Sequence, residues 1–293
     1  MNSPDSNAYS MIKRALIYIA AICAAISATA QTDSIAPLRP VTSSYMLEGG
    51  SAHLADTYLT PVHYTGEHFG FAYQRMQAMK FRPDRWVMQL KIGISADHTQ
   101  NPVKNATMWA ATLRGSWAMM HRWCLGHGLT VSAGAGASLT GGALYLSRNG
   151  NNPVAARASL TLDATGSVGW HGKVMGLPVT ARYQPTLPLT GAFFSPDYGE
   201  LYYQIYLGDH SGLCHAAWPG NYFSFDNLIT VDLHLGATAL RLGYHNRTFS
   251  SKVNNIVSRD ISHSFVIGIT TEWLSLRPGR RINPDARIIS ATY

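Results

Sequence analysis

Ten charged or imidazole side chains fall on one face of segments in which polar and apolar residues alternate. They are Lys91, Arg114, Asp163, Arg182, Asp232, His234, Arg241, His245, Arg247 and Glu272. On the wall of a narrow interior, acids and bases must pair, because a buried charge without a partner is strongly destabilising. The set therefore predicts an interior closed by salt bridges. Charged rings also select solutes in pores, so a conducting interior is the alternative for the same residues.

A lipid-hydrolysing site needs a serine nucleophile with a histidine beside it. On a strand, residues two apart share a face, and the sequence has no histidine followed two residues later by serine. His210 and Ser211 are adjacent, as are His263 and Ser264, so each pair points to opposite faces. We therefore predict no catalytic residues, and a phospholipase-like lipid-modifying enzyme is kept as an alternative function.

Twelve histidines invite a search for a metal site. None of them lies at ligand spacing with a cysteine or a carboxylate in a compact motif, and Asp232 with His234 is the one local pair on a shared face. We predict no metal and no other cofactor.

The strands that must position these side chains are best seen in residues 227–244, NLITVDLHLGATALRLGY. Apolar and polar residues alternate on both sides of a Gly236-Ala237-Thr238 turn, which is the pattern of a β-hairpin with one apolar face. The same alternation recurs at residues 85–96, 106–122, 129–145, 158–170 and 262–273. A single antiparallel transmembrane β-barrel explains it, with lipid outside and a polar lumen inside.

The number of strands follows from the positions of the turns. Bacterial barrels have tight turns on the periplasmic side, so two strands separate successive tight turns. Turns near Arg82, Gly126, Gly176 and Ala237 obey this except in the last interval, where residues 179–189, 200–207 and the hairpin's first strand make three. Residues 213–218 are the best candidate for a fourth. The prediction is an all-β barrel of twelve strands, with ten or eight as the fallback.

Composition agrees with a membrane wall. Charged residues make up 13% of the chain, against roughly 25% in a typical soluble domain. The net charge of +7 suits phosphate-rich lipid head groups, and because the basic residues are scattered we expect no nucleic-acid partner.

The chain divides into four predicted regions. Residues 1–30 are an N-terminal extension and a cleaved signal peptide, in which Lys13 and Arg14 precede an apolar run and Ala28-Thr29-Ala30 forms the cleavage site. Residues 31–43 form a periplasmic linker, residues 44–275 the barrel and residues 276–293 a basic C-terminal tail. Two cysteines follow the signal peptide, Cys124 and Cys214, and their spacing leaves open whether they are bridged.

Several segments resemble the DUF3316 family of uncharacterised outer-membrane β-barrel proteins. They are DTYLTPVHYTG at 56–66, LSRNGNNPVAARA at 146–158, GAFFSPDYGELYYQIYLG at 191–208, LRLGYHN at 240–246 and KVNNIVSRDISHSFVIGI at 252–269. The resemblance implies an exported barrel in the outer membrane and supplies no activity.

These observations predict a non-enzymatic structural, binding or narrow transport barrel with a largely plugged lumen. The alternatives are the lipid-modifying enzyme and a small-solute channel. The expected partners are outer-membrane lipid and lipopolysaccharide, with the barrel-assembly machinery during biogenesis, and a monomer is favoured over an oligomer.

Overall fold

The computed structural model describes residues 37–292, apart from residues 151, 198, 200–201, 209–211, 237 and 275–285. The predicted signal peptide and residues 31–36 of the linker lie outside the described residues. In the described part, no helix is long and apolar enough to cross a membrane.

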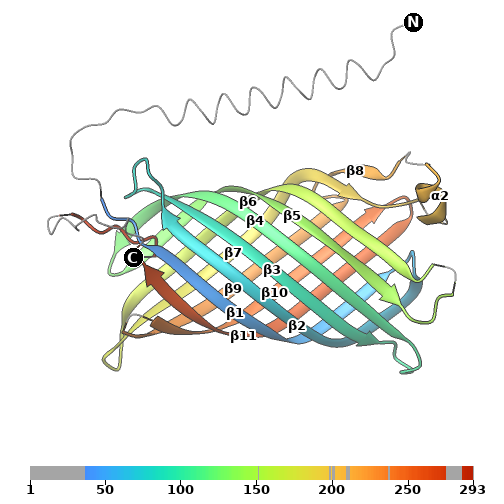
Figure 1. Cartoon of the computed structure of the whole chain (residues 1–293), viewed down its shortest axis with the longest axis horizontal. Helices are drawn as coiled ribbons and strands as arrows, with labels where there is room; N and C mark the ends of the chain where they lie inside the picture. The colour runs from blue at the N-terminus through green and yellow to red at the C-terminus, as the bar shows by residue number, and fades with distance from the viewer. Residues whose placement is uncertain are drawn as a thin grey trace, which may run out of the picture. The chain divides into compact units, whose positions relative to one another are not determined.

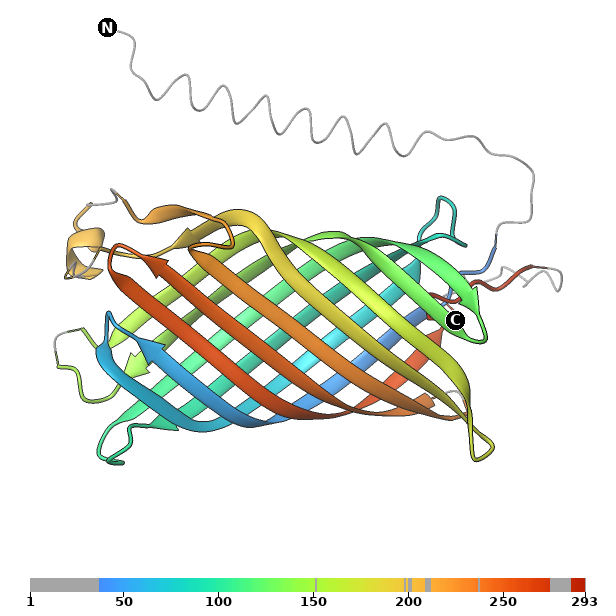
Figure 2. The same cartoon turned by 180° about the vertical axis from the view of Figure 1, so that it is seen from behind.

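Antiparallel strands form a closed barrel (Figures 1 and 2). The order around the wall is β6-β5-β4-β3-β2-β1-β11-β10-β9-β7, and pairing of β6 with β7 closes the circle. The strands are β1 (Val41–Asp56), β2 (Thr60–Ala78), β3 (Trp86–Gln100), β4 (Thr107–Gly126), β5 (Leu129–Leu146), β6 (Val154–Val174), β7 (Leu177–Phe194), β8 (Cys214–Ala217), β9 (Tyr222–Leu235), β10 (Thr238–Val253) and β11 (Ile256–Trp273).

The prediction of twelve strands is wrong, and the fallback of ten is the number in the wall of the described barrel. Residues 202–206 of the strand predicted at 200–207 form a short helix, α2 (Tyr202–Tyr206). The strand predicted at 213–218 exists as β8, but its four residues pair only with the last residues of β7. Four residues span about 13 Å, too little to cross a membrane. With both segments removed from the wall, β7 and β9 are neighbours and the turn spacing is regular.

Several strands extend beyond their predicted ends. The segment between the predicted hairpin at 227–244 and the predicted strand at 262–273 contains only a two-residue turn, in which Asn254 and Asn255 have φ values of 50° and 59°. Asparagine tolerates this left-handed conformation, which a tight hairpin turn requires at both central residues. Likewise β3 continues to Gln100, beyond the predicted strand at 85–96, and β6 begins at Val154, before the predicted strand at 158–170. Inward-facing residues near these ends therefore belong to the lumen.

The outer wall is apolar. Leu47, Ile267, Leu242 and Val231 are consecutive cross-strand neighbours on four strands, and all four side chains are exposed. Phe265 on the same face is 80% exposed. Exposed tryptophans lie toward the two ends, with Trp170 and Trp273 near one end and Trp109 near the other. This is the surface expected of a barrel wall in contact with hydrocarbon.

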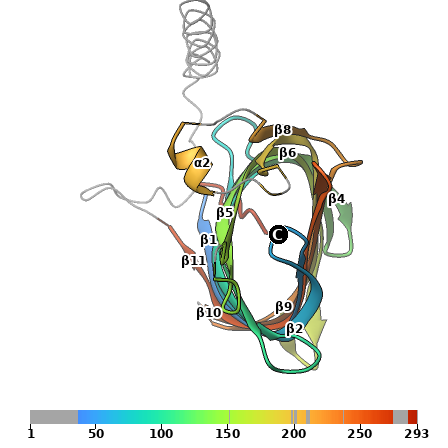
Figure 3. The same ribbon diagram turned by 90° about the vertical axis from the view of Figure 1, so that its right-hand side faces the viewer.

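The C-terminal segment packs against the barrel end where β1 begins. Ile288 makes a parallel bridge with Leu38, and Ile289 and Ala291 are buried. A view along the axis shows the red C-terminal segment within the outline of the barrel (Figure 3). Residues 286–292 of the predicted tail therefore cover this end of the lumen, and they add no strand to the wall.

Introducing a charged side chain on the outer wall tests whether this wall contacts lipid or water. We expect Ile267→Lys to destabilise the barrel in lipid vesicles by about 2–4 kcal/mol, because the lysine must enter hydrocarbon. The matched control is Val103→Lys, since Val103 is 75% exposed in the turn between β3 and β4 and should tolerate the change. Denaturant unfolding in vesicles measures both, and equal stabilities would contradict a lipid-facing wall.

Candidate functional site

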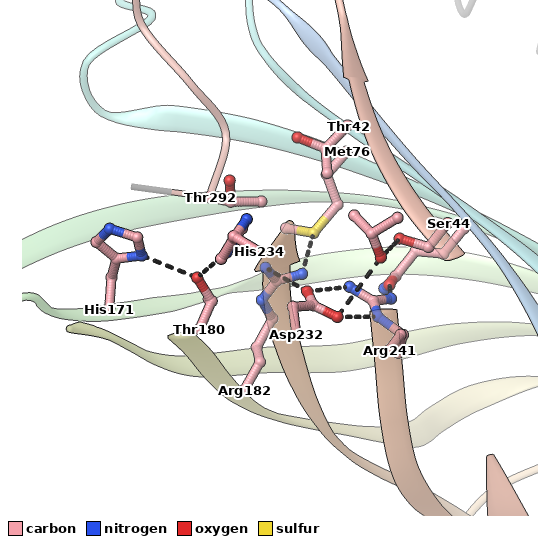
Figure 4. Close-up of polar contacts among 12 residues, drawn as sticks. Thr42, Ser44, Met76, His171, Thr180, Arg182, Asp232, His234, Arg241 and Thr292 are labelled. Atoms are coloured by element: carbon pink, nitrogen blue, oxygen red, sulfur yellow. Dashed lines mark hydrogen bonds and ion pairs between the residues drawn. The ribbon is translucent and has the colours of Figure 1, made fainter. Parts of the chain in front are cut away.

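A carboxylate buried in the lumen is held by two arginines. Asp232 on β9 accepts hydrogen bonds from Arg241 Nε at 2.6 Å and from Arg241 Nη2 at 2.7 Å. Arg182 Nη2 on β7 lies 3.8 Å from the second carboxylate oxygen. Figure 4 shows the two guanidinium groups reaching Asp232 from either side. Asp232 is 1% and Arg241 0% exposed, so this bidentate pair is shielded from water. Charge-assisted bidentate hydrogen bonds of this type are among the stronger ones in proteins.

Amides extend this cluster across the lumen. Arg241 Nη1 donates to Gln74 Oε1 at 2.9 Å, and Gln74 Nε2 donates to Gln184 Oε1 at 2.9 Å. Gln74 lies on β2 and Gln184 on β7, which are five strands apart in either direction around the wall. Both amides are 1% exposed. The contact therefore joins opposite walls, and we call these five residues, Asp232, Arg241, Arg182, Gln74 and Gln184, the central layer.

Between the central layer and the C-terminal segment, polar contacts continue. His171 Nδ1 and His234 Nε2 lie 2.9 and 2.8 Å from the Thr180 hydroxyl. Glu272 accepts a hydrogen bond from Ser290 of the C-terminal segment at 2.6 Å. Arg122 donates to the Ser290 carbonyl at 2.7 Å. Side chains and the C-terminal segment therefore line this end of the lumen, around a cavity of about 300 Å³ beside Asp232 and Arg182.

A second group of charges lies on the other side of the central layer. Glu48 contacts His245 at 2.9 Å and Arg247 at 3.5 Å, and it lies 3.7 Å from His68, whose ring contacts Asp97 at 2.5 Å. These residues come from β1, β2, β3 and β10.

Ion pairs in this second group also cross the lumen. Lys91 on β3 lies 3.8 Å from Asp226 on β9, and these strands are opposite one another. Arg157 on β6 pairs with Asp260 on β11 at 3.0 Å and with Asp56 on the opposite strand β1 at 4.0 Å. Opposite walls are therefore tied together at more than one height.

The ten residues predicted from sequence all face the interior. The structure joins Arg182, Asp232 and Arg241 in one ion-paired cluster and Lys91, His245 and Arg247 in another around Asp226. The other four have further contacts in the lumen. His234 contacts Thr180, Glu272 contacts the C-terminal segment, Asp163 accepts from Ser138 and Thr161, and Arg114 faces a cavity.

Sequence reasoning missed several interior charges, and six of them are Glu48, His68, Asp97, Arg157, Asp226 and Asp260. Glu48 and His68 lie on β1 and β2, and the alternation with Phe69 and Phe71 could have placed His68 inward. The other four lie just outside the predicted strand ends, where pairing continues after the apolar residues stop.

One serine on the outer wall has histidines as neighbours although it is not part of a His-x-Ser sequence. Ser51 and His53 share a face of β1, and His263 on β11 is the direct cross-strand neighbour of Ser51. The His263 ring contacts the Tyr244 hydroxyl at 2.6 Å. Within the described part of the chain, no hydrogen bond joins Ser51 to either histidine. The geometry that would favour a lipid-modifying enzyme is therefore not formed at this serine.

The described residues contain no group of three or more histidine, cysteine, aspartate or glutamate side chains that could hold a metal ion. Asp232 and His234, the local pair noted in the sequence, have separate partners in Arg241 and Thr180. The two cysteines are free, and they lie at opposite ends of the barrel, Cys124 near the β4–β5 turn and Cys214 in β8. A bridge between them is excluded by this separation.

A family model described as a protein of unknown function, DUF3316, matches residues 15–280. The chain belongs to the DUF3316 family. No curated protein matches this DUF3316 chain.

Several solved structures resemble this chain at low sequence identity. The translocator domain of the autotransporter NalP from Neisseria meningitidis is 10% identical, with a TM-score of 0.35, covering 92% of this chain and 98% of that one. The beta domain of the Bordetella autotransporter BrkA is 10% identical, with a TM-score of 0.39, covering 80% and 100%. The COG4313 outer-membrane channel from Pseudomonas putida F1 is 8% identical, with a TM-score of 0.33, covering 84% and 100%. Similarities with TM-scores this low give no information about the activity of this chain.

Proposed function

We propose that this DUF3316 protein is an outer-membrane barrel of a Gram-negative bacterium, exported with a cleaved signal peptide. Its lumen is closed, and it acts as a structural or binding protein without enzymatic activity and without an open channel. The observation that carries the proposal is the central layer, in which Gln74 and Gln184 join opposite walls beside the buried Asp232–Arg241 pair. The covering C-terminal segment supports the same conclusion.

The proposed location rests on the apolar outer wall and on the signal-like N-terminus. In the proposed orientation, the end where β1 begins and β11 ends is periplasmic, as in bacterial barrels with short periplasmic turns. The end that carries α2 and β8 then faces outward.

The two native cysteines test this orientation. We expect a membrane-impermeant maleimide–polyethylene glycol to label Cys214 on intact cells, and Cys124 only after the outer membrane is permeabilised, because both are exposed at opposite ends. The variants Cys214→Ser and Cys124→Ser assign each band on a gel. Labelling of intact cells that carry Cys214→Ser would overturn the orientation.

Ion conductance in a planar bilayer tests the closed lumen. We expect the purified wild-type barrel to be silent and the double variant Arg182→Ala, Arg241→Ala to leak, because it removes both cations of the central layer. The matched control is Lys252→Ala, Arg259→Ala, which removes two exposed cations and should stay silent. Heat-dependent migration on a gel verifies that each variant is folded.

Steady conductance in the wild type would refute the closed lumen and would support the small-solute channel. In that case the charged layers would act as selectivity elements.

A further inference from the structure

An internal cavity of about 150 Å³ lies between the second group of charges and the end of the barrel that carries α2. One wall is polar and comes from β4, β5 and β6, with Arg114, Ser116, Thr140 and Ser159 among its residues. The facing wall is aromatic. Phe193, Tyr222 and Phe249 come from β7, β9 and β10, and the Tyr222 ring lies 5.1 and 5.3 Å from its two neighbours.

Arg114 differs from the other cations around this cavity. Lys91, Arg157 and Arg247 each have a carboxylate within 4.0 Å. Arg114 makes no ion pair and no hydrogen bond with any of the described residues, and its side chain is half-buried against the cavity. An arginine that is shielded from bulk water and lacks a partner has five N–H groups available to an oxyanion.

Hydroxyl groups lie beside this arginine. Thr140 is the direct cross-strand neighbour of Arg114, and Ser159 is in turn the neighbour of Thr140. The Ser159 hydroxyl is engaged with Tyr222 at 2.9 Å, whereas the hydroxyls of Thr140 and Ser116 have no hydrogen-bond partner among the residues that the structure describes. The unpaired donors therefore lie together on one wall.

The acids of the cavity already have donors. Glu48, Asp56 and Asp226 are in ion pairs, and Asp163 accepts from the hydroxyls of Ser138 and Thr161. The N–H and O–H donors that remain available in the cavity therefore belong to Arg114, Thr140 and Ser116. These donors favour the binding of an anion.

We propose that this cavity binds a small organic anion, with its oxyanion held by Arg114 and Thr140 and its apolar body against Phe193, Tyr222 and Phe249. Aromatic lining with a few polar groups that fix orientation is the usual composition of a small-molecule site. The inference deepens the proposed binding role and rests on the closed lumen beneath the cavity. Tyr58 and Tyr202 lie at the outer end, their rings 5.7 Å apart, so the ligand would enter from the α2 side.

Phenyl phosphate is the probe, titrated calorimetrically into the full barrel in nonionic detergent. We expect saturable binding to the wild type and a loss of at least about tenfold in affinity in Arg114→Gln, the size of one charge-assisted hydrogen bond. Arg259→Gln is the matched control, because it removes an exposed cation elsewhere and should leave affinity unchanged. Since Arg114 has no partner to lose, the variant should fold, and heat-dependent gel migration verifies this.

Two further titrations locate the parts of the ligand. Inorganic phosphate lacks the ring and benzyl alcohol lacks the charge, so both should bind at least about tenfold more weakly than phenyl phosphate. No binding to the wild type, equal affinity in Arg114→Gln, or equal affinity for inorganic phosphate would overturn the proposal. If the barrel conducts ions yet binds phenyl phosphate through Arg114, the proposed function is wrong and this inference stands. If the barrel is silent and does not bind phenyl phosphate, this inference is wrong and the proposed function stands.

Discussion

The interior of this barrel depends on one buried carboxylate being neutralised. Asp232 is removed from water, and its charge is tolerable only because Arg241 donates to both oxygens and Arg182 lies close by. Arg241 in turn fixes Gln74, which reaches Gln184 on the opposite wall. The pairing requirement of a single acid thus sets the positions of side chains on β2, β7, β9 and β10, and these side chains connect opposite walls of the lumen.

The two-residue period of a strand makes the wall and the lumen interdependent. Arg241 points inward and Leu242 outward, so the residue that completes the central layer is next to one on the apolar outer face. A one-residue slip of β10 would place a guanidinium in hydrocarbon and a leucine beside Asp232. The ion pairs and the apolar wall therefore specify the same register. Beyond the apolar part of the wall the strands continue, and the interior charges there line a cavity.

The sequence predicts the fold class and the inward face well, because both follow from alternation that is visible within single strands. Lys91 and Asp232 could be placed inside from their neighbours alone. The pairing of Lys91 with Asp226 could not, since it depends on β3 and β9 being opposite in a ring of ten, and the strand count was wrong. The error arose at α2, whose aromatic residues carry a strand-like pattern, and at β8, which the spacing of the turns had suggested as a strand of the wall. The docking of Ser290 on Glu272 also lacks a local signal, because 18 residues separate them.

A double-mutant cycle between Asp232 and Arg241 tests most directly whether the interior depends on the neutralisation of Asp232. Unfolding free energies are measured in vesicles for Asp232→Asn, Arg241→Gln and the double variant, and the cycle is repeated for the exposed pair Asp84 and Arg287, 3.1 Å apart. We predict a coupling of about 1.5–3 kcal/mol at the buried pair, because each single change leaves a partner uncompensated, and under about 1 kcal/mol at the exposed pair. Additivity at Asp232 and Arg241 within about 0.5 kcal/mol would contradict the account.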